Sequence, residues 1–586
     1  MSLWAWPSGE SVREVAVGSE PRTLAVSPDG GLLVVTTQRQ QALAVVDLRT
    51  AKCTAKIPIG GQPVGVVLST DGRRAFDAQY AGEYVDGQYV PGAVAVVDLA
   101  KREVTARIPV RARPFAMARS ADGRLVYVTH YFQIGGKGIV TKIDTGTLAV
   151  QGEIELAEDG DVGGGRGGVF NALGSIALHP QGHRALVAGM HANVRRGVTQ
   201  SGRPLSHKTT VQAAVRICDL GRDRELSHAG IVSSFAGQAV AVPAAVTFLG
   251  DGEHFVDVYF ASHDMKIICY NERGLVAERS LLELPDGPNG IAVTRDGRTA
   301  FVNCRWARSV VQISLADVRD PKILREVRVT DEPWDAQRLL GAKVFHNTRD
   351  TRMTPNRWLP CGVCRLDGGG LSDSLVWEFT GAQKPKSPRL ANPKSLAVTS
   401  WSAPPLLITG GYKTVQEEDQ FIRSFLGGSG FIDCGGGAFP EQPEGRSPEM
   451  DAVAAFVLSL RPRPNLHLAK GRPRGEIRES ADRGKALFNS PRVRCSRCHS
   501  GPHLTRSGAA GKNKPADVGT GLRADVPSLR NCWETAPYLH DGRSRTLRDV
   551  LTTHNPDNKR GRTRDLSEQD ITDLVHFLLA PTPKDK

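Results

Sequence analysis

The segment PRTLAVSPDGGLLVV, residues 21–35, decides the fold of the N-terminal half because related segments recur along the chain. They are PVGVVLSTDGRRAFD from Pro63, PFAMARSADGRLVYV from Pro114, PAAVTFLGDGEHFVD from Pro243 and PNGIAVTRDGRTAFV from Pro288. In all five segments Asp-Gly follows the proline by eight residues, and a degenerate sixth copy has Gln181-Gly182 in that place. Self-similarity of this kind is the signature of a repeat architecture.

Each copy predicts a β-hairpin, because the glycine of the Asp-Gly turn tolerates a positive φ between two alternating strands. Further strands follow most hairpins, for example ALAVVDL at 42–48 and AVAVVDL at 93–99. Units of three or four antiparallel strands have one face to bury against a neighbour, and they stack radially. Residues 1–330 therefore predict an all-β propeller of six or seven blades, with the N-terminal strand closing the ring.

The Asp-Gly pattern, together with phrases such as AVVDL, resembles the YVTN-type β-propeller repeats of bacterial envelope proteins. The resemblance covers about half of the chain. It implies a fold and an extracytoplasmic location rather than a particular chemistry.

Past Asp331 the Asp-Gly hairpins stop, and helix-like segments with proline-rich connections begin. Two stretches of this half align with each other. GAKVF (341–345) precedes the pair Cys361/Cys364, just as GKALF (484–488) precedes the pair Cys495/Cys498. This correspondence indicates a duplication.

The duplication extends downstream of the cysteine pairs. SLAVTSWSAPPLL from Ser395 matches SLRNCWETAPYLH from Ser528 over thirteen residues in register. Each half then ends in an amphipathic helical segment, one from Ser447 and one from Ser567, whose serine can cap the first turn. We therefore expect two tandem copies of one small, mainly α-helical domain, at 336–462 and 475–586.

The second copy reads Cys495-Ser-Arg-Cys498-His499, which is the attachment signature of c-type haem. Two thiols three residues apart can add to the two haem vinyl groups, and the next imidazole then reaches the iron. The alternative is a zinc half-site, for which a second Cys or His pair should follow at finger spacing, and none does. The sequence therefore predicts one covalent haem c held by Cys495 and Cys498, with His499 as an iron ligand.

Residues 526–555, VPSLRNCWETAPYLHDGRSRTLRDVLTTHN, resemble the second haem domain of the bacterial di-haem cytochrome c peroxidases and of the related MauG-type enzymes. In that family the sixth iron ligand lies fourteen residues after the histidine of the HDG motif, and it is usually Met or Tyr. The matching position here is His554. The resemblance thus implies His499 and His554 as axial ligands, with His540 near the haem edge or fixing the HDG turn.

The first copy departs from the pattern of the resembled family. Arg365 follows Cys364 where the proximal histidine should be, Leu407 replaces the APYLH histidine, and the distal position falls near Phe421 or Ile422. His346, the remaining histidine of this predicted domain, precedes the Cys pair and cannot simply replace the missing ligand. Cys361 and Cys364 are therefore expected to form a disulfide, to remain free thiols, or to anchor a ligand-poor haem. The first copy is interpreted as a degenerate haem domain, so a second haem is not expected.

The fold class expected for the whole chain is multidomain, an all-β propeller followed by two mainly α-helical cytochrome c-like domains. The leading functional hypothesis is a c-type cytochrome for electron transfer, with the propeller as a docking or scaffold module. A peroxidase or MauG-type haem oxidoreductase, acting on peroxide, a small molecule or a protein side chain, is the alternative, and it requires an open iron site. A non-redox propeller binding protein is the third hypothesis.

Charge and targeting signals constrain the partners and the compartment. Residues 468–586 hold 23 Lys or Arg and 14 Asp or Glu, which favours an acidic redox protein, or a small-molecule electron donor or acceptor, as partner. A nucleic-acid partner is not expected because no nucleic-acid-binding motif accompanies the charge. No apolar run is long enough for a transmembrane segment. Haem attachment to CxxCH implies a periplasmic or cell-envelope location, so we expect that a signal peptide precedes the given sequence or has been removed.

Overall fold

The structure is a computed structural model, and it divides the chain into two compact units. The first unit comprises Met1–Asp335 and His346–Pro360, and the second comprises Ala336–Phe345 and Cys361–Lys586. The structure describes residues 1–5, 10–85, 88–132, 136–158, 168–192, 211–226, 231–232, 234–235, 238–270, 276–331, 334–355, 357, 359–364, 412–460, 475–501, 504–505, 526–530, 532–534, 536, 538–539 and 544–579.

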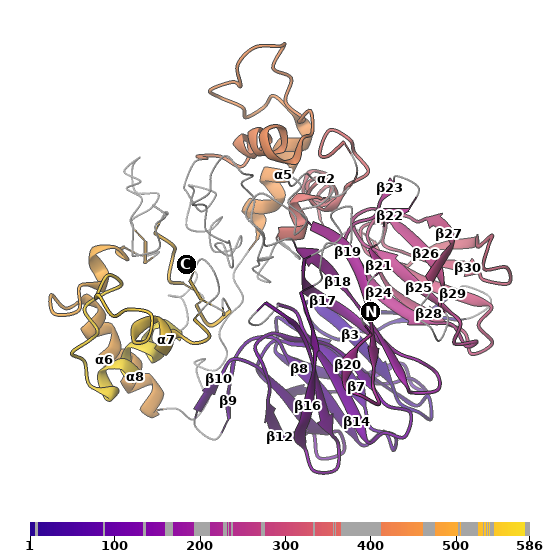
Figure 1. Cartoon of the computed structure of the whole chain (residues 1–586), viewed down its shortest axis with the longest axis horizontal. Coiled ribbons are helices and arrows are strands. Elements are labelled where there is room, and N and C mark those ends of the chain that lie inside the picture. Colours follow the sequence, from indigo (N-terminus) through magenta and orange to yellow (C-terminus); the bar gives the residue numbers. More distant parts are fainter. Residues whose placement is uncertain are drawn as a thin grey trace. The chain divides into compact units, whose positions relative to one another are not determined.

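The first unit is a six-bladed β-propeller, in which each blade is an antiparallel sheet built from strands in chain order (Figure 1). The first three blades are β3 (Pro21–Val26), β4 (Leu32–Thr37), β5 (Ala42–Asp47), β6 (Lys52–Pro58); β7 (Pro63–Leu68), β8 (Arg74–Gln79), β11 (Ala93–Asp98), β12 (Glu103–Pro109); and β13 (Pro114–Arg119), β14 (Leu125–His130), β15 (Gly138–Asp144), β16 (Ala149–Leu156). The last three are β17 (Val169–Leu178), β18 (Arg184–Ala192), β19 (Val211–Asp219), β20 (Arg224–Glu225), with β21 (Ile231–Val232) added; β24 (Pro243–Phe248), β25 (His254–Tyr259), β26 (Asp264–Tyr270), β27 (Val276–Glu283); and β28 (Pro288–Val293), β29 (Thr299–Cys304), β30 (Ser309–Ser314), β31 (Lys322–Arg328). The predicted propeller is confirmed.

Three short strand pairs accompany the blades. They are β1 (Ser2–Trp4) with β2 (Ser11–Glu14), β9 (Glu83–Val85) with β10 (Gln88–Val90), and β22 (Ser234–Phe235) with β23 (Gln238–Ala239). The β9–β10 pair is inserted between the second and third strands of its blade, which the repeat pattern did not predict.

The six repeated turns adopt the backbone that the sequence predicts. The glycine that follows each Asp or Gln has a φ between 68° and 76° at Gly30, Gly72, Gly123, Gly182, Gly252 and Gly297. In the first blade the Asp29 carboxylate accepts hydrogen bonds from the Ser27 hydroxyl at 2.5 Å and from the Gly31 amide at 3.1 Å. The same arrangement recurs with Ser69/Asp71, Ser120/Asp122 and Thr294/Asp296. The pattern Ser/Thr-x-Asp-Gly is thus one self-contained turn that starts a blade's second strand.

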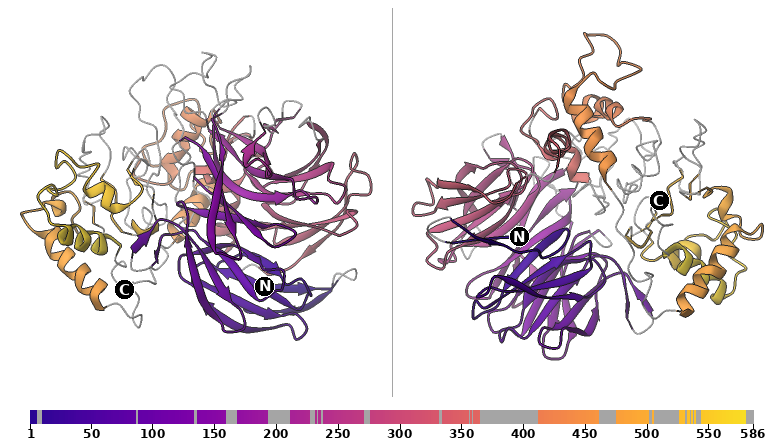
Figure 2. Two further views of the ribbon diagram at one scale, coloured as in Figure 1. Left: turned by 60° about the horizontal axis from the view of Figure 1, so that its bottom comes forward. Right: turned by 180° about the vertical axis from the view of Figure 1, so that it is seen from behind.

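The core of the propeller lies between neighbouring blades, because each sheet buries apolar side chains on both faces. Figure 2 shows the sheets fanned side by side. One cluster joins the fifth and sixth blades through Val256, Ile267, Val302 and Ile313, whose exposed fraction is 0%. Burying four such side chains contributes roughly 6 to 12 kcal/mol before the cost of chain entropy, so interblade packing makes a large favourable contribution to the stability of this unit.

The N-terminal segment lies between the first and the last blade. Val15 and Val17 pack against Leu33 and Val35 of the first blade, and the Ser2 hydroxyl donates to the Val329 carbonyl just after β31. The expectation that the N-terminal strand closes the ring is not met in the described residues, because β1 pairs with β2 in a sheet of their own and joins neither the first nor the last blade. The innermost strand of the first blade, β3, nevertheless leaves two apolar side chains exposed, Leu24 at 55% and Val26 at 50%.

The described part of the second unit is helical. Its elements are α2 (Ala336–His346), η1 (Cys361–Cys364), η2 (Gln416–Glu418), α4 (Asp419–Phe421), η3 (Ile422–Leu426), α5 (Pro448–Ser459), α6 (Gly475–Asn489), η5 (Cys495–Arg497), η6 (Cys532–Glu534), α7 (Leu547–Leu551) and α8 (Glu568–Leu579). The Ser447 hydroxyl accepts from the Met450 amide at 3.2 Å, and the Ser567 hydroxyl accepts from the Asp570 amide at 3.1 Å, so both predicted serine caps are present. None of the described helices is both long and apolar enough to cross a membrane.

The two halves of the second unit pack one helix pair in the same way. A side chain on Gly341 of α2 would meet the Ala452 carbonyl oxygen of α5, and one on Gly484 of α6 would meet the Asp573 carbonyl oxygen of α8. The ring pairs Phe345/Phe456 and Phe488/Phe577 follow at the same spacing, with centroids 5.5 Å and 5.0 Å apart. The two helix pairs therefore cross in the same way, at the two glycines that the sequence comparison aligns.

His346, at the end of α2, belongs to the first unit rather than to the second. Its ring stacks on Trp306 at 5.1 Å and 33°, and it meets Phe260 at 5.5 Å. Nearby, the Arg349 guanidinium donates to the carbonyls of Ser262 and His263. The expectation that this histidine lies in the first helical domain is wrong, because aromatic stacking holds residues 346–360 with the propeller.

Candidate haem-attachment site

The two cysteines of the signature lie on one tight turn that follows α6. Arg494 opens this turn with a left-handed φ of 64°, and Cys495–Arg497 form the 3₁₀-helix η5. The amides of Cys498 and His499 both donate to the Cys495 carbonyl, at 3.2 Å and 3.0 Å. Cys495, Cys498 and His499 therefore lie on one compact backbone turn, as the motif predicts.

Both thiols are half-buried and neither forms a disulfide. Burial raises the pKa of the Cys495 thiol to about 11, and the adjacent Cys498 adds to the shift. Cys495 is therefore a protonated thiol at neutral pH, not a reactive thiolate of the kind that catalytic cysteines use. A protonated Cys495 is a poor nucleophile at neutral pH.

The His499 ring is oriented by a backbone carbonyl. Its Nδ1 lies 3.1 Å from the Leu504 carbonyl oxygen, and because a carbonyl only accepts, Nδ1 carries the proton. The neutral ring then keeps its lone pair on Nε2, which is the nitrogen that binds a metal when Nδ1 is held in this way. Leu504 is thus a positioning residue, and no local sequence pattern indicates this role.

The loop that follows α7 returns to the cysteine turn. The Arg562 amide donates to the Val493 carbonyl at 2.8 Å, and Gly561 lies so close to Cys495 that a side chain there would sit 2.8 Å from the sulfur. Inside the loop, the side-chain amide of the buried Asn555 donates to the Gly561 carbonyl and to the Thr563 hydroxyl, both at 2.7 Å. Asn555 therefore shapes the loop, and Gly561 lets it approach the thiol.

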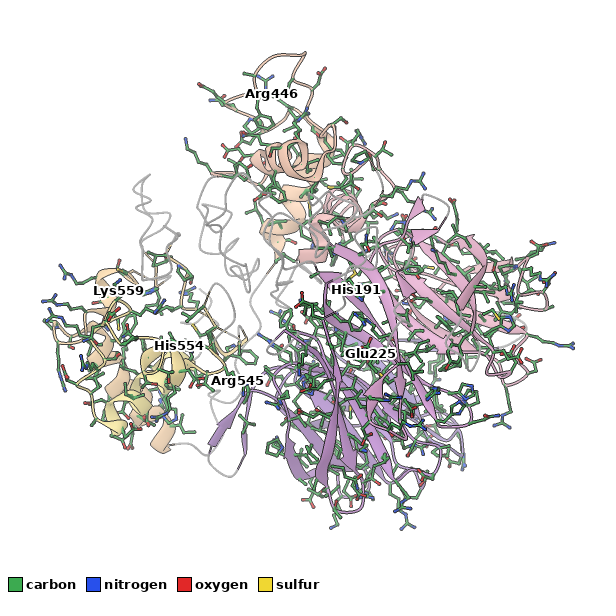
Figure 3. All side chains as sticks on the ribbon, viewed as in Figure 1. His191, Glu225, Arg446, Arg545, His554 and Lys559 are labelled. Atoms are coloured by element: carbon green, nitrogen blue, oxygen red, sulfur yellow. The ribbon has the colours of Figure 1, made fainter. Side chains whose placement is uncertain are left out.

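His554 begins this returning loop. Its amide donates to the Asp549 carbonyl of α7 at 2.9 Å, and its own carbonyl accepts from the Arg560 guanidinium. The half-buried side chain is labelled in Figure 3, within the C-terminal elements. His554 is thus on the segment that packs against the cysteine turn, and its role as second iron ligand stays a prediction.

His540, Arg365 and Leu407 lie outside the described residues. Cys361 opens η1, and burial raises the pKa of its thiol to about 12.

The donor set of the turn fits a covalently attached haem: two thiols at C-x-x-C spacing and an imidazole whose tautomer is fixed by a carbonyl. Zinc would need further ligands, and among the described residues no group of three or more His, Cys, Asp or Glu side chains is placed to hold a metal ion. Cys495, Cys498 and His499 would hold the haem.

No protein-family model matches the chain. Hydrazine synthase subunit gamma of Kuenenia stuttgartiensis is 28% identical over 148 residues, which cover 18% of this chain and 42% of that protein. The seven-bladed beta-propeller protein Rv1057 of Mycobacterium tuberculosis is 26% identical over 142 residues, which cover 24% of this chain and 34% of that protein. The chain thus spans less than half the length of these curated relatives.

Solved structures resemble the chain more remotely. Kuenenia stuttgartiensis hydrazine synthase matches 53% of this chain and 86% of that chain, with 17% identity and a TM-score of 0.40. A protein from Desulfotomaculum acetoxidans, described as functionally unknown, matches 56% of this chain and 91% of that chain, with 15% identity and a TM-score of 0.41. The chain is therefore similar, over parts of its length, to a β-propeller protein and to a subunit of hydrazine synthase.

Proposed function

We propose that the chain is a c-type cytochrome that carries one haem on Cys495 and Cys498, passes electrons, and uses its propeller as a docking or scaffold module. The observation that carries the proposal is the His499 ring, whose Nδ1 is held by the Leu504 carbonyl beside two thiols of a C-x-x-C-H turn. This arrangement prepares an imidazole for iron and supplies two sulfur anchors next to it.

The protein's own residues have distinct parts in this proposal. Cys495 and Cys498 would anchor the group, and His499 and His554 would be its iron ligands. Haem, when bound, supplies an iron that cycles between the ferrous and ferric states. Two imidazole ligands would fill the coordination sphere, which favours electron transfer over binding of peroxide. Attachment to this motif would take place in the periplasm or cell envelope.

Two alternative functions can be separated from this proposal with the experiment described below. A peroxidase or MauG-like enzyme needs an open iron site, either because His554 does not bind or because Cys361 and Cys364 hold a second haem. A non-redox binding protein would use the propeller alone, and the partial likeness to a propeller protein leaves that candidate standing.

The test uses the full chain with a secretion leader, made in a host that attaches haem c. The proposal expects a reversible reduced-minus-oxidised haem spectrum that hydrogen peroxide leaves unchanged, and loss of covalent haem in the Cys495→Ser/Cys498→Ser variant. Cys361→Ser/Cys364→Ser is the matched control and should keep the spectrum. A peroxide-dependent spectral change would favour the enzyme, and a colourless wild-type protein would favour the binding protein.

A further inference from the structure

The two segments that form the cysteine turn and the returning loop are strongly basic. These segments carry six exposed basic side chains, which are together called the basic collar: Arg492, Arg494, Arg497, Lys559, Arg562 and Arg564. Figure 3 labels Lys559 near His554 in the C-terminal part of the chain. The same segments, 490–500 and 554–564, contain one acidic residue, Asp557.

Backbone contacts hold the collar around the thiol anchors. The Arg562 amide bonds the Val493 carbonyl at 2.8 Å, and the Arg492 guanidinium donates to the Asp565 carbonyl at 3.3 Å. Gly561, between Arg560 and Arg562, lies against the Cys495 sulfur. The positive charges are therefore fixed beside the proposed haem rather than spread over mobile termini.

One of the six collar residues is paired with an acidic side chain of the described residues. Arg492 meets the Asp570 carboxylate at 3.7 Å, and the other five have no ion pair within the described part of the chain. The guanidinium groups of Arg562 and Arg497 lower the pKa of Arg494, which shows that these like charges repel one another. An anionic surface placed against the collar would relieve that repulsion.

We propose that the basic collar is the docking surface for an acidic protein that exchanges electrons with the haem site; this inference rests on the proposed function. Long-range attraction between opposite charges raises the rate of encounter and orients the partners. The collar segments contain no Phe, Tyr or Trp on which nucleic-acid bases would stack, and their one large aliphatic residue, Val493, is buried. Neither a nucleic acid nor a membrane surface is therefore the favoured ligand.

The test measures binding first, so that it does not depend on haem. A fluorescein-labelled poly-L-glutamate peptide is titrated with the full chain at low ionic strength, and anisotropy is recorded. Arg562→Glu/Arg564→Glu should weaken binding by about tenfold or more, and added salt should weaken wild-type binding. Arg279→Glu/Arg446→Glu is the matched control, because it changes two exposed arginines elsewhere by the same total charge and should stay within about twofold.

A second measurement connects the collar with electron transfer. When ferrous haem protein is mixed with ferricyanide, one electron passes to the anion, giving ferric haem and ferrocyanide, and no bond forms or breaks. The collar variant should slow this reaction and should speed the reaction with the cation tris(phenanthroline)cobalt(III), whereas the control variant should change neither. Thermal melting of each variant confirms that the fold is kept.

Three outcomes would overturn the inference: equal binding by collar and control variants, tighter binding of duplex DNA than of poly-glutamate through the same arginines, or collar-dependent binding to anionic vesicles alone. Failure of the proposed function would appear in a different measurement, as the absence of covalent haem from the wild-type protein. The Cys495→Ser/Cys498→Ser protein lacks the anchors but keeps the collar, so it should still bind the peptide.

Discussion

Gly484 of α6 lies directly on the backbone of Asp573 in α8, so that a Cβ at this position would fall 1.9 Å from the Asp573 carbonyl oxygen. Gly341 of α2 has the same relationship with Ala452 of α5, also at 1.9 Å. Glycine is required at both places because no side chain fits between the crossing helices. The two helix pairs thus cross in the same way, and the tandem duplication of one domain stays a prediction from the sequence.

Gly484→Ala should therefore destabilise the second unit, although alanine is the better helix former. The gain in helix propensity is about 1 kcal/mol, and overpacking against a fixed backbone costs typically about 1 to 3 kcal/mol. We expect a net loss of about 2 kcal/mol or less in the free energy of unfolding, measured by urea unfolding followed by far-UV circular dichroism. Glu479→Ala, on the exposed side of the same helix, is the control and should change little. An equal change in the free energy of unfolding of both variants would show that Gly484 is not packed against the backbone of α8.

The propeller should lose stability on acidification because of His130. Burial lowers the pKa of His130 to about 4, although its ring nitrogens bond the Ala112 carbonyl and the Thr141 hydroxyl. Between the ordinary histidine pKa of about 6.5 and this lowered value, the unfolded chain binds a proton that the folded chain excludes. The stability that His130 contributes is therefore complete above pH ~6.5 and is lost as the pH falls towards 4, on the order of 3 kcal/mol.

The measurement is the melting temperature of wild type and His130→Gln between pH 4 and pH 7.5. The wild type should fall more steeply below pH ~6.5 than the variant, since glutamine cannot take up the proton. Parallel curves would show that His130 does not cause the acid sensitivity.

Two leucines of the first blade should contribute very differently to stability, because one is exposed on the innermost strand β3 and the other is buried. Leu24 is 55% exposed, whereas Leu43 of β5 is 0% exposed within an interblade cluster. Leu43→Ala should cost about 2 to 5 kcal/mol, and Leu24→Ala less than about 1 kcal/mol. Thermal unfolding of the two variants checks the contrast, and a large loss at Leu24 would mean that another surface covers β3.

His554 gives a spectroscopic prediction. If it is the second iron ligand, His554→Ala opens one coordination position, so the ferric absorption spectrum should shift from low spin to high spin, and the protein should then bind cyanide or peroxide. His576→Ala is the control, since His576 is held by the Ser480 hydroxyl at 2.8 Å between α6 and α8. An unchanged spectrum in His554→Ala would remove His554 from the coordination sphere.

Local patterns predicted the features that depend on a few neighbouring residues. The Asp-Gly spacing predicted all six turns at positive φ, and the C-x-x-C-H motif predicted the compact turn at Cys495. The serine or threonine two residues before most of the turn aspartates was visible in the sequence, but its hydroxyl hydrogen bond was not anticipated. These features need no distant contacts, which is why spacing alone suffices.

Features that depend on distant contacts were missed. Stacking on Trp306 draws His346 to the propeller, and no local pattern indicates this. The approach of Gly561 to Cys495 depends on the hydrogen bonds of Asn555, which close a loop about 60 residues downstream of the cysteine. The carbonyl of Leu504 likewise acquires its role only through the fold, because every residue has a carbonyl.

We propose that the turn at Cys495 holds one covalent haem and that the first copy holds none. A pyridine haemochrome assay on denatured full-length protein, with the protein concentration measured in parallel, tests it most directly. We predict one covalent haem per chain, unchanged in Cys361→Ser/Cys364→Ser and absent in Cys495→Ser/Cys498→Ser. Two haems per chain, or none in protein exported by a host that attaches haem c, would contradict the account.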